Sequence, residues 1–390
     1  IVRGTLAACG RDVLDAGVAA TPTLGVLVRG QNAAGGVQIS ASHNPPPYNG
    51  IKLFNRDGRV LPARDGEAVL RAYRQPVPAW KAFDRIGQIS TLQDTTNNHL
   101  SCVLGTINVD QVSKQKFRVL LDSNAGAGSV LGRRLLTDLS CEVTVLGGQP
   151  NGKFEHAPEP TAPNLAAVCS RVKESGAAVG FCQDPDADRL AIIDENGRYI
   201  GEEYTLAICL NHELRERLGP IVTNCATSRM AEDLAAKYGV PFYRSAVGEA
   251  NVVDKMLDVG AVFGGEGNGG PIDPRVGLVR DSFVGMALVL AAMASRGKRV
   301  SELADELPRY EIVKRTASLP ANKLPAALDA AQRRFADAKP NRLDGLRLDW
   351  ADRWLIVRGS NTEPIVRIIA EAPTAAAAEE LVATCANVIA

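Results

Sequence analysis

Strand-length apolar runs alternate with helix-length amphipathic segments along most of the chain. This alternation is typical of α/β domains, in which helices connect the strands of a sheet. The strands that it predicts are 13–14, 37–40, 117–121, 143–146, 177–182, 190–193, 221–223, 242–244 and 261–263. The helices that it predicts end at residue 8, begin near residue 23, and span 130–139, 163–175, 228–238 and 251–259.

The order of elements changes after Pro308. A strand is predicted at 311–317 and a helix at 323–336, followed by three strand-like runs ending near Ile369 and an Ala-rich helix. This order is typical of an α+β fold. The αβ units before Pro308 resemble one another, which suggests an ancient repeat. We therefore predict four domains, at 1–90, 91–198, 199–308 and 309–390.

Composition narrows the classes of partner and compartment. Lys plus Arg and Asp plus Glu both number 44, so no long-range field favours nucleic acid or an anionic membrane. The longest apolar stretch, 284–294, is too short to span a bilayer, which needs about 20 residues. The eight cysteines are scattered, without a C-x-x-C pair, which is typical of buried thiols in a reducing cytosol. We expect a cytoplasmic monomer or homodimer.

Ser42 lies in the first of four polar loops that carry candidate chemistry. It follows an apolar run that ends at Ile39 and predicts a buried strand, and the loop continues through His43 and three prolines. Because prolines stiffen the backbone, the hydroxyl can be held in place for attack, which predicts a nucleophile. Taken alone, this loop also fits an Asn-Pro turn without a chemical role.

Asp184, Asp186 and Asp188 alternate with other residues in the second loop. In an extended or looped backbone their carboxylates can converge on one hard cation such as Mg²⁺. An EF-hand is one alternative, because Glu195 occupies the twelfth position counted from Asp184. Arg189 stands where that loop needs glycine, however, and the apolar run after it predicts a strand instead of a helix. A solvated acidic turn is the other alternative.

Glu266 and Asn268 lie between glycines in the third loop. Glycines let a backbone approach a ligand closely, so the carboxylate and the amide can hold two neighbouring sugar hydroxyls. A plain Gly-rich turn is the alternative.

The fourth loop has the composition of a phosphate clamp. Its candidate residues are Arg358, Ser360, Asn361, Thr362 and Arg367. Arginines supply charge, and hydroxyls and loop N–H groups supply donors. A charged β-turn, the alternative, leaves the two flanking arginines unexplained. We expect this loop to close over a substrate as a lid.

Taken together and in this order, the loops at 40–45, 184–189, 264–270 and 358–364 resemble the serine, metal-binding, sugar-binding and phosphate-binding loops of the α-D-phosphohexomutase superfamily. The resemblance spans nearly the whole chain. It implies three similar mixed-sheet α/β domains followed by a smaller α+β C-terminal domain around a central cleft. It also implies interconversion of hexose 6-phosphate and hexose 1-phosphate through a phosphoserine enzyme and a 1,6-bisphosphate intermediate. The expected cofactors are Mg²⁺ and the hexose 1,6-bisphosphate as an activator.

The resemblance also implies roles for residues of the first two loops. Ser42 would carry the phosphoryl group, which would complete the ligand set of the metal. Lys52 would act as a general base or stabilise the migrating phosphoryl group. His43 would orient the loop. Arg189 would grip phosphate oxygens, although it could instead neutralise the acidic loop.

Two departures from the family pattern affect these expectations. Members often have histidine where this chain has Gly270, so no acid-base role is expected there. They usually carry a further strand and helix, with an arginine near the nucleophile, before the point where this sequence begins. We therefore expect the first domain to lack its start, and we do not transfer that role to Arg3.

The substrates implied by the resemblance are glucosamine, mannose and glucose phosphates. Similarity at 39–54 and 266–270 favours glucosamine phosphate. Two other functions remain open at this stage. One is a Mg²⁺-dependent sugar phosphatase, in which water accepts the phosphoryl group. The other is a non-catalytic protein that binds sugar phosphates.

Overall fold

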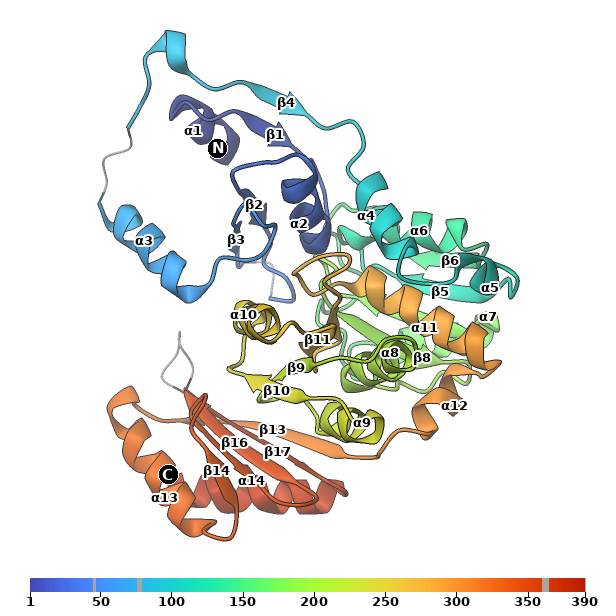
Figure 1. The fold of residues 1–390 in the computed structure, drawn as a ribbon, viewed down its shortest axis with the longest axis vertical. Helices are drawn as coiled ribbons and strands as arrows, with labels where there is room; N and C mark the ends of the chain where they lie inside the picture. The colour runs from blue at the N-terminus through green and yellow to red at the C-terminus, as the bar shows by residue number, and fades with distance from the viewer. Residues whose placement is uncertain (45–46, 76–78, 360–364, 390) are drawn as a thin grey trace. The chain divides into compact units, whose positions relative to one another are not determined.

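A computed structural model describes residues 1–390 except 45–46, 76–78, 360–364 and 390 (Figure 1). The chain forms two compact units. The first consists of 1–205 and 269–301, and the second of 206–268 and 302–390. Each unit therefore contains segments that are distant in the sequence.

The first unit contains three complete β-sheets, the short strand β12, and helices. Its strands are β1 (Val13–Asp15), β2 (Gly36–Ile39), β3 (Ile51–Phe54), β4 (Ile89–Thr91), β5 (Arg118–Asp122), β6 (Glu142–Leu146), β7 (Val179–Gln183), β8 (Leu190–Asp194) and β12 (Gly270–Ile272). Its helices are α1 (Val2–Ala8), α2 (Thr21–Gly30), α3 (Ala63–Arg74), η1 (Phe83–Arg85), α4 (Asn97–Leu104), α5 (Val109–Ser113), α6 (Gly128–Asp138), α7 (Ala166–Ser175) and α11 (Ser282–Arg296). The largest sheet has the order β6-β5-β7-β8. Its first three strands are parallel, and β8 is antiparallel to β7.

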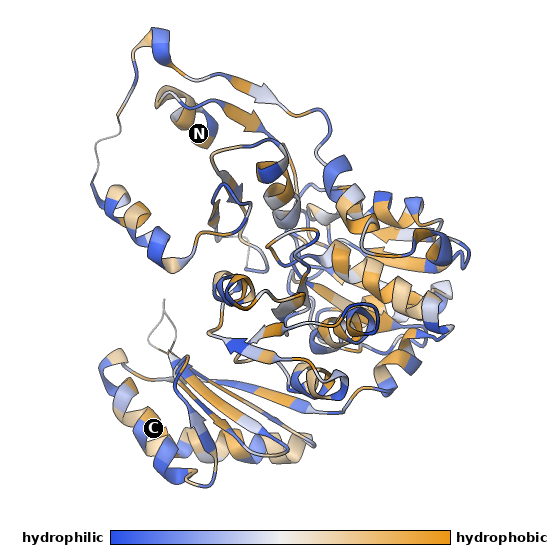
Figure 2. Ribbon diagram, viewed as in Figure 1, coloured by the Kyte–Doolittle hydropathy of each residue, from blue (hydrophilic) through white to orange (hydrophobic). Residues whose placement is uncertain are grey.

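The core of this unit lies around β5, β7 and α11. All residues of β7 are buried, as are those of β5 after Arg118, which is typical of strands covered on both faces. Helix α11 is buried from Ser282 to Ala294 and contacts β8, α4, α5 and α6. Figure 2 shows α11 almost entirely in hydrophobic colours. The loop that joins β7 to β8 therefore borders a buried apolar core.

The second unit contains a parallel sheet and a larger antiparallel sheet. Its strands are β9 (Ile221–Asn224), β10 (Phe242–Ser245), β11 (Phe263–Glu266), β13 (Glu311–Ser318), β14 (Lys339–Asn341), β15 (Leu346–Asp349), β16 (Trp354–Gly359) and β17 (Ile365–Ala372). Its helices are α8 (Glu202–Glu216), α9 (Met230–Tyr238), α10 (Glu249–Val259), α12 (Val300–Asp305), η2 (Ala321–Lys323), α13 (Leu324–Arg334) and α14 (Ala375–Ile389). The strand β9 pairs in parallel with β10 and β11. The antiparallel sheet has the order β13-β17-β16-β15-β14.

The central strands of the antiparallel sheet, β15, β16 and β17, are mainly buried, and β16 packs on both faces. Leu355 and Val357 of β16 pack in one apolar cluster with residues of α13 and α14. Trp354 and Ile356 point the other way and pack in a cluster with Cys225, which follows β9. Because side chains alternate along a strand, Arg358 lies on the same face as Trp354 and Ile356.

The strands and helices predicted before residue 308 occur in the predicted order, and the α+β order after it is confirmed. The prediction omitted several elements, among them β3, α8 and α11, and three further details were wrong. The short strand β14 was missed, because it is an exposed edge strand that contains Pro340 and lacks an apolar run. The strand before Ser40 is not buried, since Ile39 is 58% exposed and β2 belongs to a two-stranded sheet with β3. The strand predicted to end at Phe263 is β11, which begins there and ends at Glu266.

All eight cysteines have free thiols, as predicted. Burial raises the pKa of Cys225 to about 11 and that of Cys141 to about 12. These thiols are therefore poor nucleophiles. Among the described residues, no helix is long and apolar enough to cross a membrane.

Candidate active site

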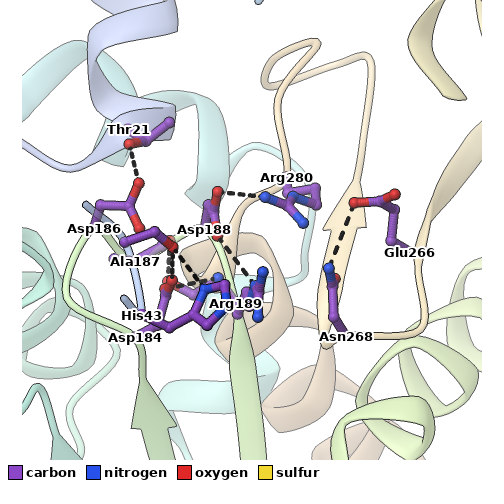
Figure 3. Close-up of polar contacts among 12 residues, drawn as sticks. Thr21, His43, Asp184, Asp186, Ala187, Asp188, Arg189, Glu266, Asn268 and Arg280 are labelled. Carbon is purple, nitrogen blue, oxygen red and sulfur yellow. Dashed lines mark hydrogen bonds and ion pairs between the residues drawn. The ribbon is translucent and has the colours of Figure 1, made fainter. Parts of the chain in front are cut away.

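Three buried aspartates share the loop between β7 and β8 (Figure 3). Asp184 and Asp188 are fully buried and Asp186 is 2% exposed. One carboxylate oxygen of each lies within 4.8 Å of one from each of the others. Three carboxylates this close repel one another strongly inside a protein, so the surrounding groups must offset their charge.

Two of these carboxylates keep an oxygen that accepts no hydrogen bond from the described residues, although Nε of Arg189 lies 3.9 Å from Oδ1 of Asp188. Oδ1 of Asp186 and Oδ1 of Asp188 are buried and have no hydrogen-bond partner among the described residues. A buried acceptor without a partner costs free energy, and carboxylate oxygens are the preferred ligands of hard cations. The loop therefore fits a divalent cation of the Mg²⁺ class.

Cationic and hydroxyl groups already occupy the other oxygens. Nζ of Lys52 donates to Oδ2 of Asp186 at 2.6 Å and to Oδ2 of Asp188 at 2.9 Å. Nη2 of Arg280 donates to the same oxygen of Asp188 at 2.6 Å. Oγ1 of Thr21 donates to Oδ2 of Asp186 at 2.6 Å. These donors offset part of the negative charge of the loop.

The aspartates have different electrostatic environments. Burial, followed by the charges of the other two aspartates, raises the pKa of Asp184 well above its usual value. Burial opposes the charge of Asp188 as well, but Arg280, Lys52 and Arg189 together hold its pKa below its usual value. Of these two carboxylates, Asp188 is therefore the one that the protein stabilises more strongly as an anion.

The hydroxyl of Ser42 lies directly against the acidic loop. Its Oγ donates to Oδ2 of Asp184 at 2.9 Å, and its backbone N–H donates to Oγ of Ser40 at 2.9 Å. The φ angle of Ser42 is +49°, in the left-handed region that residues other than glycine rarely adopt. Such backbone strain clusters at functional sites, where the surrounding structure holds it in place.

His43 and Arg189 lie on either side of Glu159. Nδ1 of His43 is 3.4 Å from Oγ of Ser42, and its Nε2 is 3.9 Å from Oε1 of Glu159. Burial and then the charge of Arg189 lower the pKa of His43, which favours the neutral ring at pH 7. Nη1 of Arg189 is 3.7 Å from the same Glu159 oxygen, and its side chain is 13% exposed. Both side chains therefore lie beside the acidic loop.

The N-terminus of α11 forms hydrogen bonds with the backbone of the acidic loop. Ala187 has a φ of +57°, and its carbonyl accepts hydrogen bonds from the backbone N–H and Oγ of Ser282, the latter at 2.7 Å. Asp281 caps α11 and lies 2.7 Å from Nε2 of the buried His99. The loop conformation is therefore fixed by groups more than 90 residues away in the sequence.

Gly270 makes room for Arg280. A Cβ atom at position 270 would lie 2.5 Å from Cδ of Arg280 and 2.9 Å from its Cβ. Any larger residue would push the arginine away from Asp188. The absence of histidine at this position is therefore linked to the packing of Arg280.

Glu266 and Asn268 belong to the second unit. Oε1 of Glu266 accepts hydrogen bonds from Nδ2 of Asn224 at 2.7 Å and from the backbone N–H of Gly248 at 3.1 Å. Nδ2 of Asn268 lies 3.5 Å from Oε2 of Glu266 (Figure 3). Oδ1 of Asn268 is buried without a partner among the described residues. The carboxylate is therefore held rigidly, and the amide retains an acceptor for a hydroxyl.

Arg358 and Arg367 are directly opposite each other on β16 and β17. Like charges in that position destabilise a sheet unless an anion offsets them, which fits a phosphate site. Nε of Arg358 donates to Oδ2 of Asp344 at 2.9 Å. The predicted clamp residues Ser360, Asn361 and Thr362 lie outside the described residues.

The sequence reasoning missed Thr21, Arg280, Glu159, Asn224 and Asp344. Each is an ordinary polar residue in its local sequence and reaches its partner only through the tertiary fold. The EF-hand alternative is excluded, because residues after Arg189 form β8 and Glu195 accepts a hydrogen bond from Oγ of Ser301 instead of joining the aspartates.

Four domain models match the chain in order. They are described as phosphoglucomutase/phosphomannomutase alpha/beta/alpha domains I (residues 1–76), II (97–197) and III (202–310), and the C-terminal domain (315–388) of the same enzymes. All four belong to one enzyme family, and together they span nearly the whole chain.

Similar full-length proteins carry related names. A phosphoglucomutase/phosphomannomutase from Thermococcus kodakarensis is 36% identical over 96% of this chain and 83% of its own length. A Methanopyrus kandleri protein assigned as a phosphoglucosamine mutase is 32% identical over the same shares. A solved Thermus thermophilus protein assigned as a phosphomannomutase has a TM-score of 0.82 and 25% identity, covering 98% of this chain and 84% of that one. The N-acetylphosphoglucosamine mutase of Aspergillus fumigatus, solved with GlcNAc-6P and magnesium, has a TM-score of 0.61 and 16% identity, covering 95% and 92%.

Replacing Arg280 with Met tests how much the acidic loop depends on this cation. Without Arg280, Asp188 keeps only Lys52 and Arg189 of the described residues as compensating cations, so the free energy of unfolding in the absence of divalent cations should fall, by up to about 3–5 kcal/mol. Urea unfolding followed by circular dichroism measures the change. Arg71→Met, which removes the exposed partner of Glu67, is the control and should change stability by less than about 1 kcal/mol. Equal losses in the two variants would contradict this account of the loop.

Proposed function

Because the chain belongs to the phosphoglucomutase/phosphomannomutase family, we propose that it interconverts hexose 6-phosphate and hexose 1-phosphate through a phosphoserine enzyme. The observation that carries this proposal is the hydrogen bond from Oγ of Ser42 to Asp184 at 2.9 Å, beside three buried aspartates. A hydroxyl held in a strained loop against a cation-binding cluster is suited to phosphoryl transfer. We further propose domain boundaries at 1–90, 91–198, 199–308 and 309–390, and a cytoplasmic monomer or homodimer.

The proposed reaction consists of two phosphoryl transfers. In the first, the P–Oγ bond of phosphorylated Ser42 breaks and a P–O bond forms to the free hydroxyl of the hexose monophosphate, which loses its proton to a base. This step gives a hexose 1,6-bisphosphate. The bisphosphate then reorients in the site. In the second transfer the P–O bond of its other phosphoryl group breaks, a P–Oγ bond to Ser42 forms, and the sugar oxygen regains a proton. The bisphosphate would also act as an activator, because it phosphorylates Ser42 when the serine is free.

Asp184, Asp186, Asp188 and a phosphate on Ser42 would hold Mg²⁺. The oxygens of Asp186 and Asp188 that accept no hydrogen bond from the described residues support this assignment. When bound, the ion neutralises charge on the transferring phosphoryl group. The magnesium in the Aspergillus fumigatus structure is a further parallel, although that likeness is one of fold.

Lys52 would stabilise the phosphoryl group in transit. Its ammonium group is bound to two carboxylates, which makes it a donor and supports this role over that of a general base. Arg189, with Glu159 as its neighbour, would grip phosphate oxygens through its planar fork. His43 would orient the loop, because its ring is close to Oγ of Ser42 and favours the neutral form.

The remaining candidate residues would bind the parts of the substrate that do not react. Glu266 and Asn268 would bind two neighbouring sugar hydroxyls. Arg358 and Arg367 would bind the non-reacting phosphate, with Ser360, Asn361 and Thr362 as further donors. The proposed substrates are glucosamine, mannose and glucose phosphates, with glucosamine phosphate favoured. The alternatives of a sugar phosphatase and a non-catalytic binder are not favoured, because the similar proteins bear the names of mutases.

Ser42→Ala should abolish mutase activity while leaving the fold intact, because it removes only the covalent carrier. We expect turnover to fall by roughly a thousandfold or more. Intact-mass measurement after incubation with glucose 1,6-bisphosphate should show one added phosphoryl group on the wild type and none on the variant. Ser90→Ala, at an exposed position of β4, should behave like the wild type. A wild type that gains no phosphoryl group, together with a variant that still turns over, would exclude the mechanism.

Asp186→Asn should weaken Mg²⁺ binding and remove most of the rate. The metal contributes several kcal/mol to the transition state, so we expect a loss of roughly a hundredfold or more. The measurements are the rate as a function of Mg²⁺ concentration and the Mg²⁺-induced rise in Tm. Asp57→Asn, in an exposed turn, is the control. Stabilisation by Ca²⁺ alone, with a rate that ignores Mg²⁺, would contradict the assignment.

Arg358→Ala should raise KM and release the intermediate. Losing one charge-assisted contact is worth on the order of 1.5–3 kcal/mol, or roughly ten- to a hundredfold in KM. Free 1,6-bisphosphate should accumulate in the medium during turnover. Arg342→Ala, which breaks an exposed pair with Asp329, is the control. An unchanged KM without released intermediate would remove Arg358 from the clamp but leave the mutase proposal standing.

A further inference from the structure

Asp344 lies between the phosphate-binding candidate Arg358 and a loop of the parallel sheet. Its Oδ2 accepts a hydrogen bond from Nε of Arg358 at 2.9 Å and another from the backbone N–H of Val247 at 3.0 Å. The side chains of Arg358 and Asp344 are 13% and 19% exposed. One carboxylate oxygen therefore joins an arginine of β16 to the loop between β10 and α10.

The backbone beside Asp344 is built for this contact. Gly345, the next residue, has a φ of +71°. A Cβ atom there would lie 2.2 Å from the carbonyl oxygen of Val357 and 2.9 Å from Cα of Arg358. Only glycine allows the turn before β15 to press this closely against β16. The turn thus delivers the Asp344 carboxylate to the guanidinium.

The same loop also supports Glu266. The backbone N–H of Gly248 donates to Oε1 of Glu266 at 3.1 Å. The neighbouring Val247 packs against the cluster that contains Trp354 and Ile356 of β16. Successive backbone N–H groups of one loop therefore bind Asp344 and Glu266.

Resting on the proposed function, we propose that Asp344 is a positioning residue that fixes Arg358 relative to the loop supporting Glu266. Among the described residues, Arg358 donates to Asp344 through Nε, so its two Nη groups can bind phosphate as a fork. A long arginine side chain otherwise loses rotamer entropy when it binds an anion. Asp344 restricts the rotamers of Arg358 before the anion binds, and it fixes the position of Arg358 relative to the loop that supports Glu266.

Charge and position make different demands on residue 344. A carboxylate beside a phosphate-binding arginine weakens the attraction for phosphate, so its charge alone would disfavour binding. Its hydrogen bonds favour binding by holding Arg358 in place. Both donors reach the same oxygen, and an amide oxygen can accept two hydrogen bonds. Asparagine at position 344 can therefore accept the same two hydrogen bonds without carrying the negative charge.

The test is a set of kinetic measurements with glucose 1-phosphate as substrate. Asp344→Ala should raise KM by roughly three- to tenfold, the effect of an ordinary hydrogen bond, because the variant loses the positioning of Arg358 and not a contact with phosphate. The kcat should change by less than about twofold. Asp344→Asn should keep KM within about twofold of the wild type. In the Arg358→Ala background, Asp344→Ala should raise KM no further, because the residue that it positions is gone.

Asp329→Ala is the matched control, since it also removes the aspartate of an Asp–Arg pair in the same part of the chain. It should leave KM and kcat unchanged. Three results would overturn the positioning role while the mutase proposal stands. They are an unchanged KM in Asp344→Ala, an equal rise in KM with Arg358 present and with Arg358→Ala, and an Asn variant whose KM is as high as that of the Ala variant. A wild type that isomerises none of the three hexose phosphates would overturn both.

Discussion

The mutual repulsion of Asp184, Asp186 and Asp188 is the constraint on which the first unit depends. Three carboxylates whose oxygens lie within 4.8 Å of one another, almost without exposure, need compensating charge. The fold supplies Lys52 from β3 and Arg280 from the segment before α11. One oxygen each of Asp186 and Asp188 accepts no hydrogen bond from the described residues and can bind a cation. The same cluster accepts the hydroxyl of Ser42. The negative charge of the three aspartates makes the loop costly to bury, and the same charge suits it to bind the cation that a phosphoryl-transfer site needs.

The second unit handles charge in a different way. Arg358 and Arg367 are cross-strand neighbours, an arrangement that is unfavourable unless an anion binds, and Asp344 holds one of them in a fixed direction. Glu266 is held by Asn224 and Gly248 with its carboxylate buried. In each unit charged side chains are held in fixed positions where a ligand of opposite charge can bind: the aspartates for a cation, and the arginines for a phosphate. This preorganisation reduces the free-energy cost of binding.

The sequence was informative where local pattern and motif coincide. The alternation of apolar runs indicated β5, β7 and β8, and the aspartates between β7 and β8 could be assigned because their spacing depends only on the backbone. Strand β14 and the exposure of Ile39 could not be predicted, since a short edge strand has no apolar run and an apolar residue carries no mark of its burial. Arg280, Thr21 and Asp344 were missed because their roles come from contacts across 92, 165 and 14 residues. Such contacts are properties of the tertiary fold.

The central claim is that the phosphoryl group passes between enzyme and sugar by way of a bisphosphate. The most direct measurement follows radiolabelled phosphate from a hexose 1,6-bisphosphate during turnover of glucosamine, mannose and glucose monophosphates. The account predicts that label enters the protein and both monophosphates of the preferred sugar, while inorganic phosphate stays at background. Isomer formed without exchange of label, or inorganic phosphate released in step with sugar consumption, would contradict it.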